Sequence, residues 1–245
     1  MGRYFLTLQY DGTAYHGWQI QPNATTVEET IENALATLLR QPVDIIGAGR
    51  TDTGVHARIM KAHFDWNCEL PMETAQLVYK LNKILPNDIA ILDIKRVAND
   101  MHARFSAKSR TYHYFIHSQK NAFLNRYSYY ITYNLDYEKM NQAAAILKRY
   151  SDFESFCKSN TDVKTTICAI YEAEWHVTSD TTAYFSITAN RFLRNMVRAI
   201  VGTLIDVGRG KTTLDDFCNI IEKKSRSNAG DSMPAKALFL ENIKY

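Results

Sequence analysis

The amino-acid sequence predicts an α+β protein made of two halves with a similar layout. Segments with the two-residue period of strands alternate with segments of helical period along the 245 residues. The order strand, helix, strand begins a second time after residue 105. No low-complexity linker separates the halves and the chain has only five prolines. We therefore expect subdomains 1–105 and 106–245 to pack face to face around a central cleft.

The first half opens with a strand and a capped helix. Residues 3–10 alternate with period two and end in the turn pair Asp11-Gly12. Thr26 and Glu29 have the spacing of a capping box, and apolar residues recur after them at helical spacing. The expected elements after this helix, which ends near residue 40, are strands at 43–46 and 59–65 and a helix at 74–84.

The second half repeats the alternation of strands and helices. Residues 111–118 read as a strand, and Asp136 precedes a run of apolar residues on one helical face. The further elements expected in this half are strands at 169–176 and 183–188 and helices at 192–207 and 214–223.

Composition excludes several classes of protein. Hydrophobic residues make up 46% of the chain and charged residues 22%, an ordinary globular balance. The first residues lack the basic start and apolar core of a signal peptide, and the longest apolar run, 199–205, is too short to span a membrane. We expect a cytoplasmic protein without a membrane anchor. The four cysteines show no CxxC spacing, which favours buried or inert thiols: Cys68, Cys157, Cys168 and Cys218.

Basic residues are concentrated in one part of the chain. The net charge of +3 is too small to indicate a nucleic-acid partner by itself. Residues 101–126, however, hold five basic and no acidic residues, interleaved with aromatic ones. Such a segment could follow a phosphate backbone and stack on bases, or it could be a solvated strand with its other face in the core.

The stretch IIGAGRTDTGVHARIMKAHF at 45–64 places Arg50, Asp52 and His56 in a glycine-bounded loop. The loop does not match the phosphate-binding P-loop, because Val55-His56 follow Gly49 to Gly54 where that motif needs lysine and serine or threonine. It does not match the dinucleotide fingerprint either, because Asp52 stands where the third glycine would be needed. An aspartate in a turn is most often a cap for backbone amides. The nearby Arg50 favours the alternative, a nucleophilic or basic carboxylate facing an anionic polymer. His56 and His63 have no matching ligands, so a metal site is disfavoured.

A second basic constellation lies in NRFLRNMVRAIVG at 190–202. Arg191, Arg194 and Arg198 are spaced by three and four, which would place them along one face of a helix. No acidic residue occupies a neighbouring helical position, so another part of the chain or a phosphate backbone must balance their charge.

Several long motifs together resemble one known family. GAGRTDTGVHA, HARFSAKSRTYHY and FLRNMVRAIVG occur in this order, with YDGTAYHGWQIQP near the start and GDSMPAKALFL near the end. The set is similar to the signature regions of the bacterial TruA family of tRNA pseudouridine synthases and covers nearly the whole chain. The resemblance implies two ferredoxin-like (RNA-recognition-like) subdomains, a mixed and mainly antiparallel sheet, a homodimer, and no metal or organic cofactor. It also implies tRNA as substrate, with uridine isomerised to pseudouridine at positions 38–40 of the anticodon stem-loop.

The same resemblance implies roles for individual residues. Asp52 corresponds to the essential aspartate, and Arg50 to the residue that takes part in flipping the target base. Tyr112 corresponds to the tyrosine that stacks on the flipped uridine and is a candidate for proton handling. Arg198, with Arg194 as the alternative, corresponds to the basic partner of the catalytic carboxylate. The remaining tRNA contacts expected are His102, Arg104, Phe105, Arg110, Lys158 and Arg194.

Two other functions explain part of the pattern. A non-catalytic RNA-binding module would use the same aromatic and basic residues but would have no use for Asp52 beside Arg50. A glycosidase also cleaves a glycosidic bond, but it ordinarily needs two carboxylates, and only Asp52 stands out near these motifs.

Overall fold

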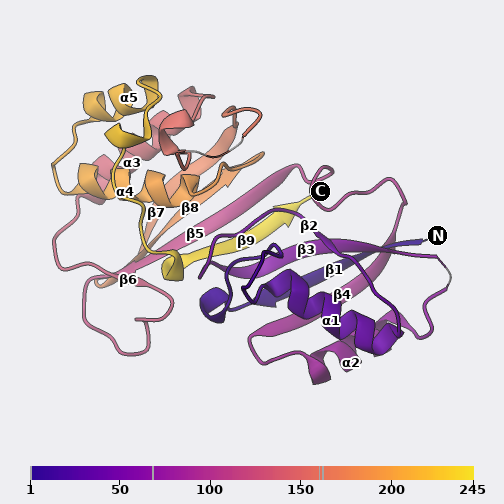
Figure 1. Cartoon of the computed structure of the whole chain (residues 1–245). Coiled ribbons are helices and arrows are strands. Elements are labelled where there is room, and N and C mark those ends of the chain that lie inside the picture. Colours follow the sequence, from indigo (N-terminus) through magenta and orange to yellow (C-terminus); the bar gives the residue numbers. More distant parts are fainter. Residues whose placement is uncertain (1, 68, 160, 162) are drawn as a thin grey trace. The chain divides into compact units, whose positions relative to one another are not determined.

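The computed structural model describes residues 2–67, 69–159, 161 and 163–245, and Figure 1 shows its helices and strands. The chain divides into two compact units, residues 1–108 with 239–245 and residues 109–238. The predicted α+β class with a mixed, mainly antiparallel sheet is confirmed. Cys68, Asn160 and Asp162 lie outside the described residues.

The first unit has a ferredoxin-like order of elements. Its strands and helices are β1 (Gly2–Tyr10), α1 (Val27–Leu39), β2 (Ile46–Gly47), β3 (His56–Trp66), α2 (Thr74–Ile84), β4 (Ile89–Val97) and β9 (Leu238–Lys244). The central strand β1 pairs antiparallel with β3 and β4. β2 pairs antiparallel with β3, and β9 pairs parallel with the start of β3.

The core of the first unit follows from its periodic apolar residues. The Thr26 hydroxyl accepts a hydrogen bond from the Glu29 amide at 3.4 Å, which begins α1 at the expected place. Figure 1 shows α1 and α2 side by side against the sheet. Burying each large aliphatic side chain contributes about 1.5 to 3 kcal/mol. Fully buried examples from the sheet and both helices are Leu6, Leu8, Ile31, Leu35, Leu77 and Leu81.

Among the described residues, the second unit combines a mainly antiparallel sheet of four strands with three α-helices. Its elements are β5 (Ser109–His117), β6 (Tyr129–Tyr130), α3 (Tyr137–Ile146), β7 (Ile170–Ser179), β8 (Thr182–Ala189), α4 (Met196–Gly208) and α5 (Leu214–Glu222). β8 lies between β5 and β7, and β6 pairs parallel with β5. The largest fully buried side chains of this unit are Tyr114, Phe153, Phe156, Phe185 and Phe217.

The arginine-bearing helix starts later than expected. α4 begins at Met196, not near residue 192, because Asn195 has a left-handed backbone with φ of 66°. Arg191 and Arg194 therefore precede the helix, and the prediction that they share a helical face with Arg198 is wrong.

The end of the chain lies with the first unit, whereas the sequence division assigned residues 106–245 to one subdomain. The reason is strand pairing: His56 of β3 pairs with Phe239 of β9, and Ala57 pairs with Leu240. Residues 239–245 thereby complete the sheet of the first unit.

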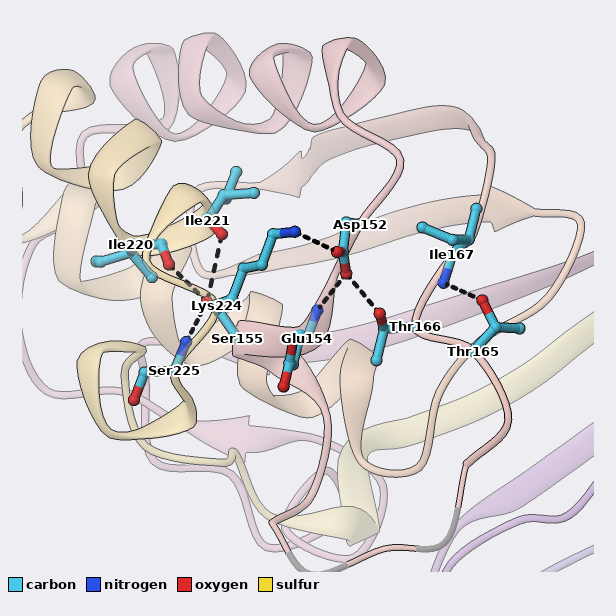
Figure 2. A network of polar contacts seen from close by, with 10 residues as sticks. All are labelled: Asp152, Glu154, Ser155, Thr165, Thr166, Ile167, Ile220, Ile221, Lys224 and Ser225. Carbon is cyan, nitrogen blue, oxygen red and sulfur yellow. Dashed lines mark hydrogen bonds and ion pairs between the residues drawn. The ribbon is translucent and has the colours of Figure 1, made fainter.

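A polar network fixes the segment that leads to Lys158 (Figure 2). The Asp152 carboxylate contacts the Lys224 ammonium at 2.8 Å and accepts from the Thr166 hydroxyl at 2.6 Å. These hydrogen bonds lower the pKa of Asp152. The Ser155 hydroxyl donates to the Ile220 carbonyl at 2.6 Å and accepts from the Ser225 amide at 3.0 Å. The network thus joins Thr166 to Asp152, and ties Asp152 and Ser155 to residues in the last turn of α5 and just beyond it.

Of the described cysteines, Cys157 and Cys168 are buried as expected, whereas Cys218 is only partly buried. Burial raises the pKa of the Cys168 thiol to about 11. Among the residues that the structure describes, no helix is long and apolar enough to cross a lipid bilayer.

Candidate functional site

Asp52 lies on a tight turn that precedes β3. The Val55 amide donates to the Asp52 carbonyl at 3.1 Å, and Gly54 has a φ of 76°. Thr51 is buried, whereas the Asp52 side chain is partly exposed. The turn thus presents one carboxylate from a backbone that is anchored beneath it.

The segment 10–18 holds this turn on both sides of Asp52. The Tyr10 and Thr51 hydroxyls form a buried hydrogen bond of 2.8 Å. The Trp18 amide donates to the Thr51 carbonyl at 3.3 Å, and the Gly54 amide donates to the Tyr15 carbonyl at 3.3 Å. Because buried backbone groups need partners, these bonds fix the path of the chain before and after Asp52.

Two glycines allow the segment 10–18 to approach so closely. A Cβ atom on Gly12 would lie 2.0 Å from the Val55 carbonyl oxygen. A Cβ atom on Gly17, which has a φ of 91°, would lie 2.4 Å from the Thr51 carbonyl oxygen. Only glycine satisfies both the contact and the left-handed backbone at position 17. The sequence identified Gly12 only as part of a turn pair and gave no sign of this bracing role.

The bracing segment is itself held by the rest of the first unit. The Tyr15 hydroxyl donates to the Asp88 carboxylate at 2.7 Å, and burial together with this bond raises the pKa of Tyr15. The Gly12 amide donates to Nδ1 of the buried His56 at 3.1 Å. The His56 ring stacks on Phe239 of β9 with a centroid separation of 4.5 Å. The turn at Asp52 is thus connected to the sheet by several independent contacts.

Arg50 is exposed, and its charge acts on Glu28 of α1. Burial raises the pKa of the Glu28 carboxyl, and hydrogen bonds from Ile20 and Trp18 and the charge of Arg50 oppose this rise. The Glu28 carboxylate accepts from the Trp18 indole at 3.0 Å. Arg50 therefore interacts electrostatically with the Glu28 carboxylate, which is also hydrogen-bonded to Trp18 of the segment 10–18.

The structure brings His102, Arg104 and Phe105 together on one compact turn. Nδ1 of His102 accepts from the Arg104 amide at 3.1 Å and from the Phe105 amide at 3.3 Å. Phe105 is 77% exposed. The Arg104 guanidinium lies 5.7 Å from the centroid of the Phe105 ring. An exposed aromatic ring beside a guanidinium suits a contact with a base and a phosphate.

His63 of β3 lies beneath this turn. It is 1% exposed, and its Nδ1 accepts from the Ala103 amide at 3.2 Å. Burial is the main reason that the pKa of His63 falls to about 4, and the positive charges of Arg3 and His102 lower it further. The imidazole is therefore neutral in the folded protein at neutral pH.

The remaining predicted residues lie in the second unit. Tyr112 of β5 meets the Phe192 ring edge-on at a centroid distance of 5.2 Å. The Arg110 guanidinium donates to the Asn190 carbonyl at 2.7 Å. Arg198 of α4 donates through Nε to the Met233 carbonyl.

Lys158 and Arg194 are neighbours although 36 positions separate them in the sequence. The Lys158 amide donates to the Arg194 carbonyl at 3.0 Å, and both side chains are exposed. Their charges are thereby brought to one part of the surface of the second unit, as a contact with phosphates requires.

No group of three or more His, Cys, Asp and Glu side chains among the described residues is placed to hold a metal ion. The first unit presents the Asp52 carboxylate on a braced turn and, on a second turn, the Arg104 guanidinium beside the exposed Phe105 ring. The second unit presents the exposed side chains of Lys158 and Arg194.

Comparison with known proteins gives a consistent result. The model of a family described as tRNA pseudouridine synthase matches residues 7–106 and 143–245. A protein of Bacteroides fragilis named tRNA pseudouridine synthase A is 55% identical over 99% of this chain and 96% of its own length. A protein of the same name from Porphyromonas gingivalis is 54% identical over 100% of this chain and 98% of its own. Another from Caldicellulosiruptor bescii is 42% identical over the full length of both chains.

Replacing Gly17 by alanine is expected to impair catalysis far more than folding. The new methyl group would meet the Thr51 carbonyl and displace the turn at Asp52, and a misplacement of about 1 Å can cost about 100-fold in rate. The measurement is the turnover number, with the melting temperature recorded for the same samples.

Gly210→Ala is the matched control, because Gly210 also has a positive φ, 72°, but among the described residues no atom beyond its two chain neighbours lies within 4 Å of a Cβ built there. Both variants bear a backbone strain of about 1 to 2 kcal/mol, so equal turnover numbers for the two would show that the close contact at Gly17 has no role in catalysis.

His63 is expected to make stability depend on pH. The unfolded chain takes up a proton on this residue near its ordinary pKa of 6.5, and the folded chain only near 4. The neutral form of His63 therefore leaves the free energy of unfolding at its full value above pH 6.5. This free energy decreases as the pH falls from 6.5 towards 4, because the unfolded chain then binds a proton that the folded chain does not. Unfolding free energies measured with urea at pH 7 and pH 5 should differ by about 2 kcal/mol more in the natural protein than in His63→Asn, which cannot titrate. If the free energies of unfolding of the two proteins change equally with pH, the lowered pKa of His63 is contradicted.

Proposed function

The chain belongs to the family of tRNA pseudouridine synthases, and from this premise we propose that it isomerises uridine to pseudouridine in tRNA with Asp52 as the reactive carboxylate. The observation that carries the proposal is the turn that presents Asp52 from a braced backbone. A catalytic group held in advance avoids the free-energy cost of ordering it during the reaction.

The overall reaction is balanced without any co-reactant. The bond between N1 of uracil and C1′ of the ribose breaks, the base turns, and C5 forms the new bond to C1′. The proton on C5 is then lost, and N1 gains a proton. The chemistry requires a carboxylate, a way to hold the freed base, and a proton acceptor, and Asp52 supplies the first of these.

Arg50 and Tyr112 are proposed to flip the target base out of its helix and to hold it there. A stacked uridine must leave its helix before a side chain can reach it, at a cost of a few kilocalories per mole. An arginine that enters the vacated position and a tyrosine that stacks on the extruded base would offset this cost. The Tyr112 hydroxyl, or a water bound to it, is also the proposed acceptor of the C5 proton. Arg198 is the basic residue proposed to favour the ionised form of the carboxylate.

The remaining residues are proposed to bind the tRNA through its backbone and shape, as A-form RNA requires. They are His102, Arg104, Phe105, Arg110, Lys158 and Arg194. Positions 38–40 of the anticodon stem-loop are the proposed targets, and a cytoplasmic homodimer is the proposed working form. The high identity to relatives named tRNA pseudouridine synthase A supports these assignments.

The direct test is release of tritium from C5-labelled uridine in an unmodified tRNA transcript. The natural protein should release tritium, and Asp52→Asn should release none while binding tRNA within a few-fold of the natural affinity, because a neutral amide cannot act as the reactive carboxylate. Turnover by Asp52→Asn would remove Asp52 from the mechanism. Binding without release by either protein would favour an RNA-binding module instead.

Salt dependence of tRNA binding tests the proposed phosphate contacts. Arg104→Ala and Arg194→Ala should each weaken binding and reduce the slope of log K against log salt by about 0.7 to 0.9, the value for one phosphate contact. Lys148→Ala, which removes an exposed charge beyond α3, is the control and should leave the slope unchanged. A natural slope in either arginine variant would mean that this side chain contacts no phosphate.

A further inference from the structure

The turn that carries Arg104 and Phe105 is anchored through Ala103, the residue before them. Ala103 is completely buried. Its amide donates to Nδ1 of His63 at 3.2 Å, and its carbonyl accepts from the Tyr245 hydroxyl at 2.6 Å. Both polar groups of this residue are therefore satisfied by side chains from β3 and from the end of the chain.

The environment of His63 fixes its tautomer. Besides the bond at Nδ1, a backbone hydrogen bond with Ile46 of β2 raises the pKa of His63 against the larger effects of burial and nearby charge. Because Nδ1 accepts from the Ala103 amide and the ring is neutral, Nε2 carries the proton. The neutral ring thus links the sheet on one side to the turn on the other.

Other groups hold the same arrangement. The Arg3 guanidinium forms a paired hydrogen bond with Asp65, at 2.8 and 2.7 Å, and donates to the Met101 carbonyl at 2.9 Å. The His102 ring meets the His63 ring edge-on at 4.6 Å and lies 4.3 Å from the Phe105 ring. The exposed Phe105 is therefore the outermost ring of a column that begins at the buried His63.

We propose that His63 is a positioning residue for tRNA binding, because its Nδ1 fixes the Ala103 amide and so sets where the Arg104 and Phe105 side chains stand. The proposal rests on the proposed tRNA contact of that turn. His63 itself is buried and touches no RNA. Removing its acceptor leaves the Ala103 amide buried without a partner, a cost of about 1 to 3 kcal/mol that the chain can avoid by moving the turn.

The two amide-bearing replacements of histidine separate the roles of the two ring nitrogens. In His63→Asn the side-chain oxygen can occupy the place of Nδ1, so the bond from Ala103 is kept. In His63→Gln the amide reaches the place of Nε2, so only the contact with Ile46 is kept. His63→Leu keeps neither.

The measurements are the tRNA dissociation constant and the separate values of KM and kcat. We expect Gln and Leu to raise the dissociation constant and KM about tenfold, the equivalent of one hydrogen bond, with kcat preserved. Asn should stay within about threefold of the natural protein. Leu77→Ala, which opens a cavity beneath α2 without touching the turn, controls for lost stability and should leave the dissociation constant unchanged.

Two results with the His63 variants and their stability control would overturn the proposal. One is equal tRNA affinity in the Asn, Gln and Leu variants. The other is an effect that follows the melting temperature alone, so that Leu77→Ala weakens binding as much as His63→Leu does. If Arg104→Ala and Phe105→Ala leave affinity unchanged, the contact of the turn with tRNA fails and the role of His63 fails with it. Tritium release tests Asp52 independently of that outcome.

Discussion

The close approach of residues 10–18 to the turn at Asp52 is the constraint on which the site depends. It requires glycine at positions 12 and 17, where any side chain would meet a carbonyl oxygen of the turn. The hydrogen bond between the Tyr10 and Thr51 hydroxyls and those donated by the Trp18 and Gly54 amides can form only because the two segments are in contact. A carboxylate on an anchored backbone needs no reorganisation before it reacts, which is the usual advantage of a site built on a rigid support.

The secondary structure could be predicted from periodicity except where the backbone departs from it. α2 has the expected bounds, Thr74–Ile84, because its apolar residues recur without interruption. The sequence analysis did not predict β4. The pairing of β4 with β1 shifts its register between Thr7 and Leu8, and this irregularity breaks the two-residue alternation of β4 at Leu92. The start of α4 was misplaced because the left-handed Asn195 leaves no mark on the spacing of apolar residues.

The chemical groups of the site could be predicted from the sequence, but their supports could not. Asp52 and Arg50 stand out by residue type within a glycine-bounded loop. The contacts that brace the turn at Asp52 join residues 33 to 43 positions apart, and a glycine required by a distant carbonyl looks like any other turn glycine. In the same way, His63 was weighed only as a metal ligand, since its bond to Ala103 depends on a fold that brings positions 63 and 103 together.

Both exposed turns of the first unit are held by buried hydrogen bonds that involve no net charge. The hydroxyls of Tyr10 and Thr51 hold the turn at Asp52, and the neutral ring of His63 holds Ala103. Salt screens charges at the surface but has little effect on buried, uncharged bonds. Raising the ionic strength should therefore weaken the proposed phosphate contacts while the turns keep their shape. In the proposed complex the arginines would contribute the salt-dependent part of the tRNA affinity, and the buried hydrogen bonds would keep the turns in one shape at every salt concentration.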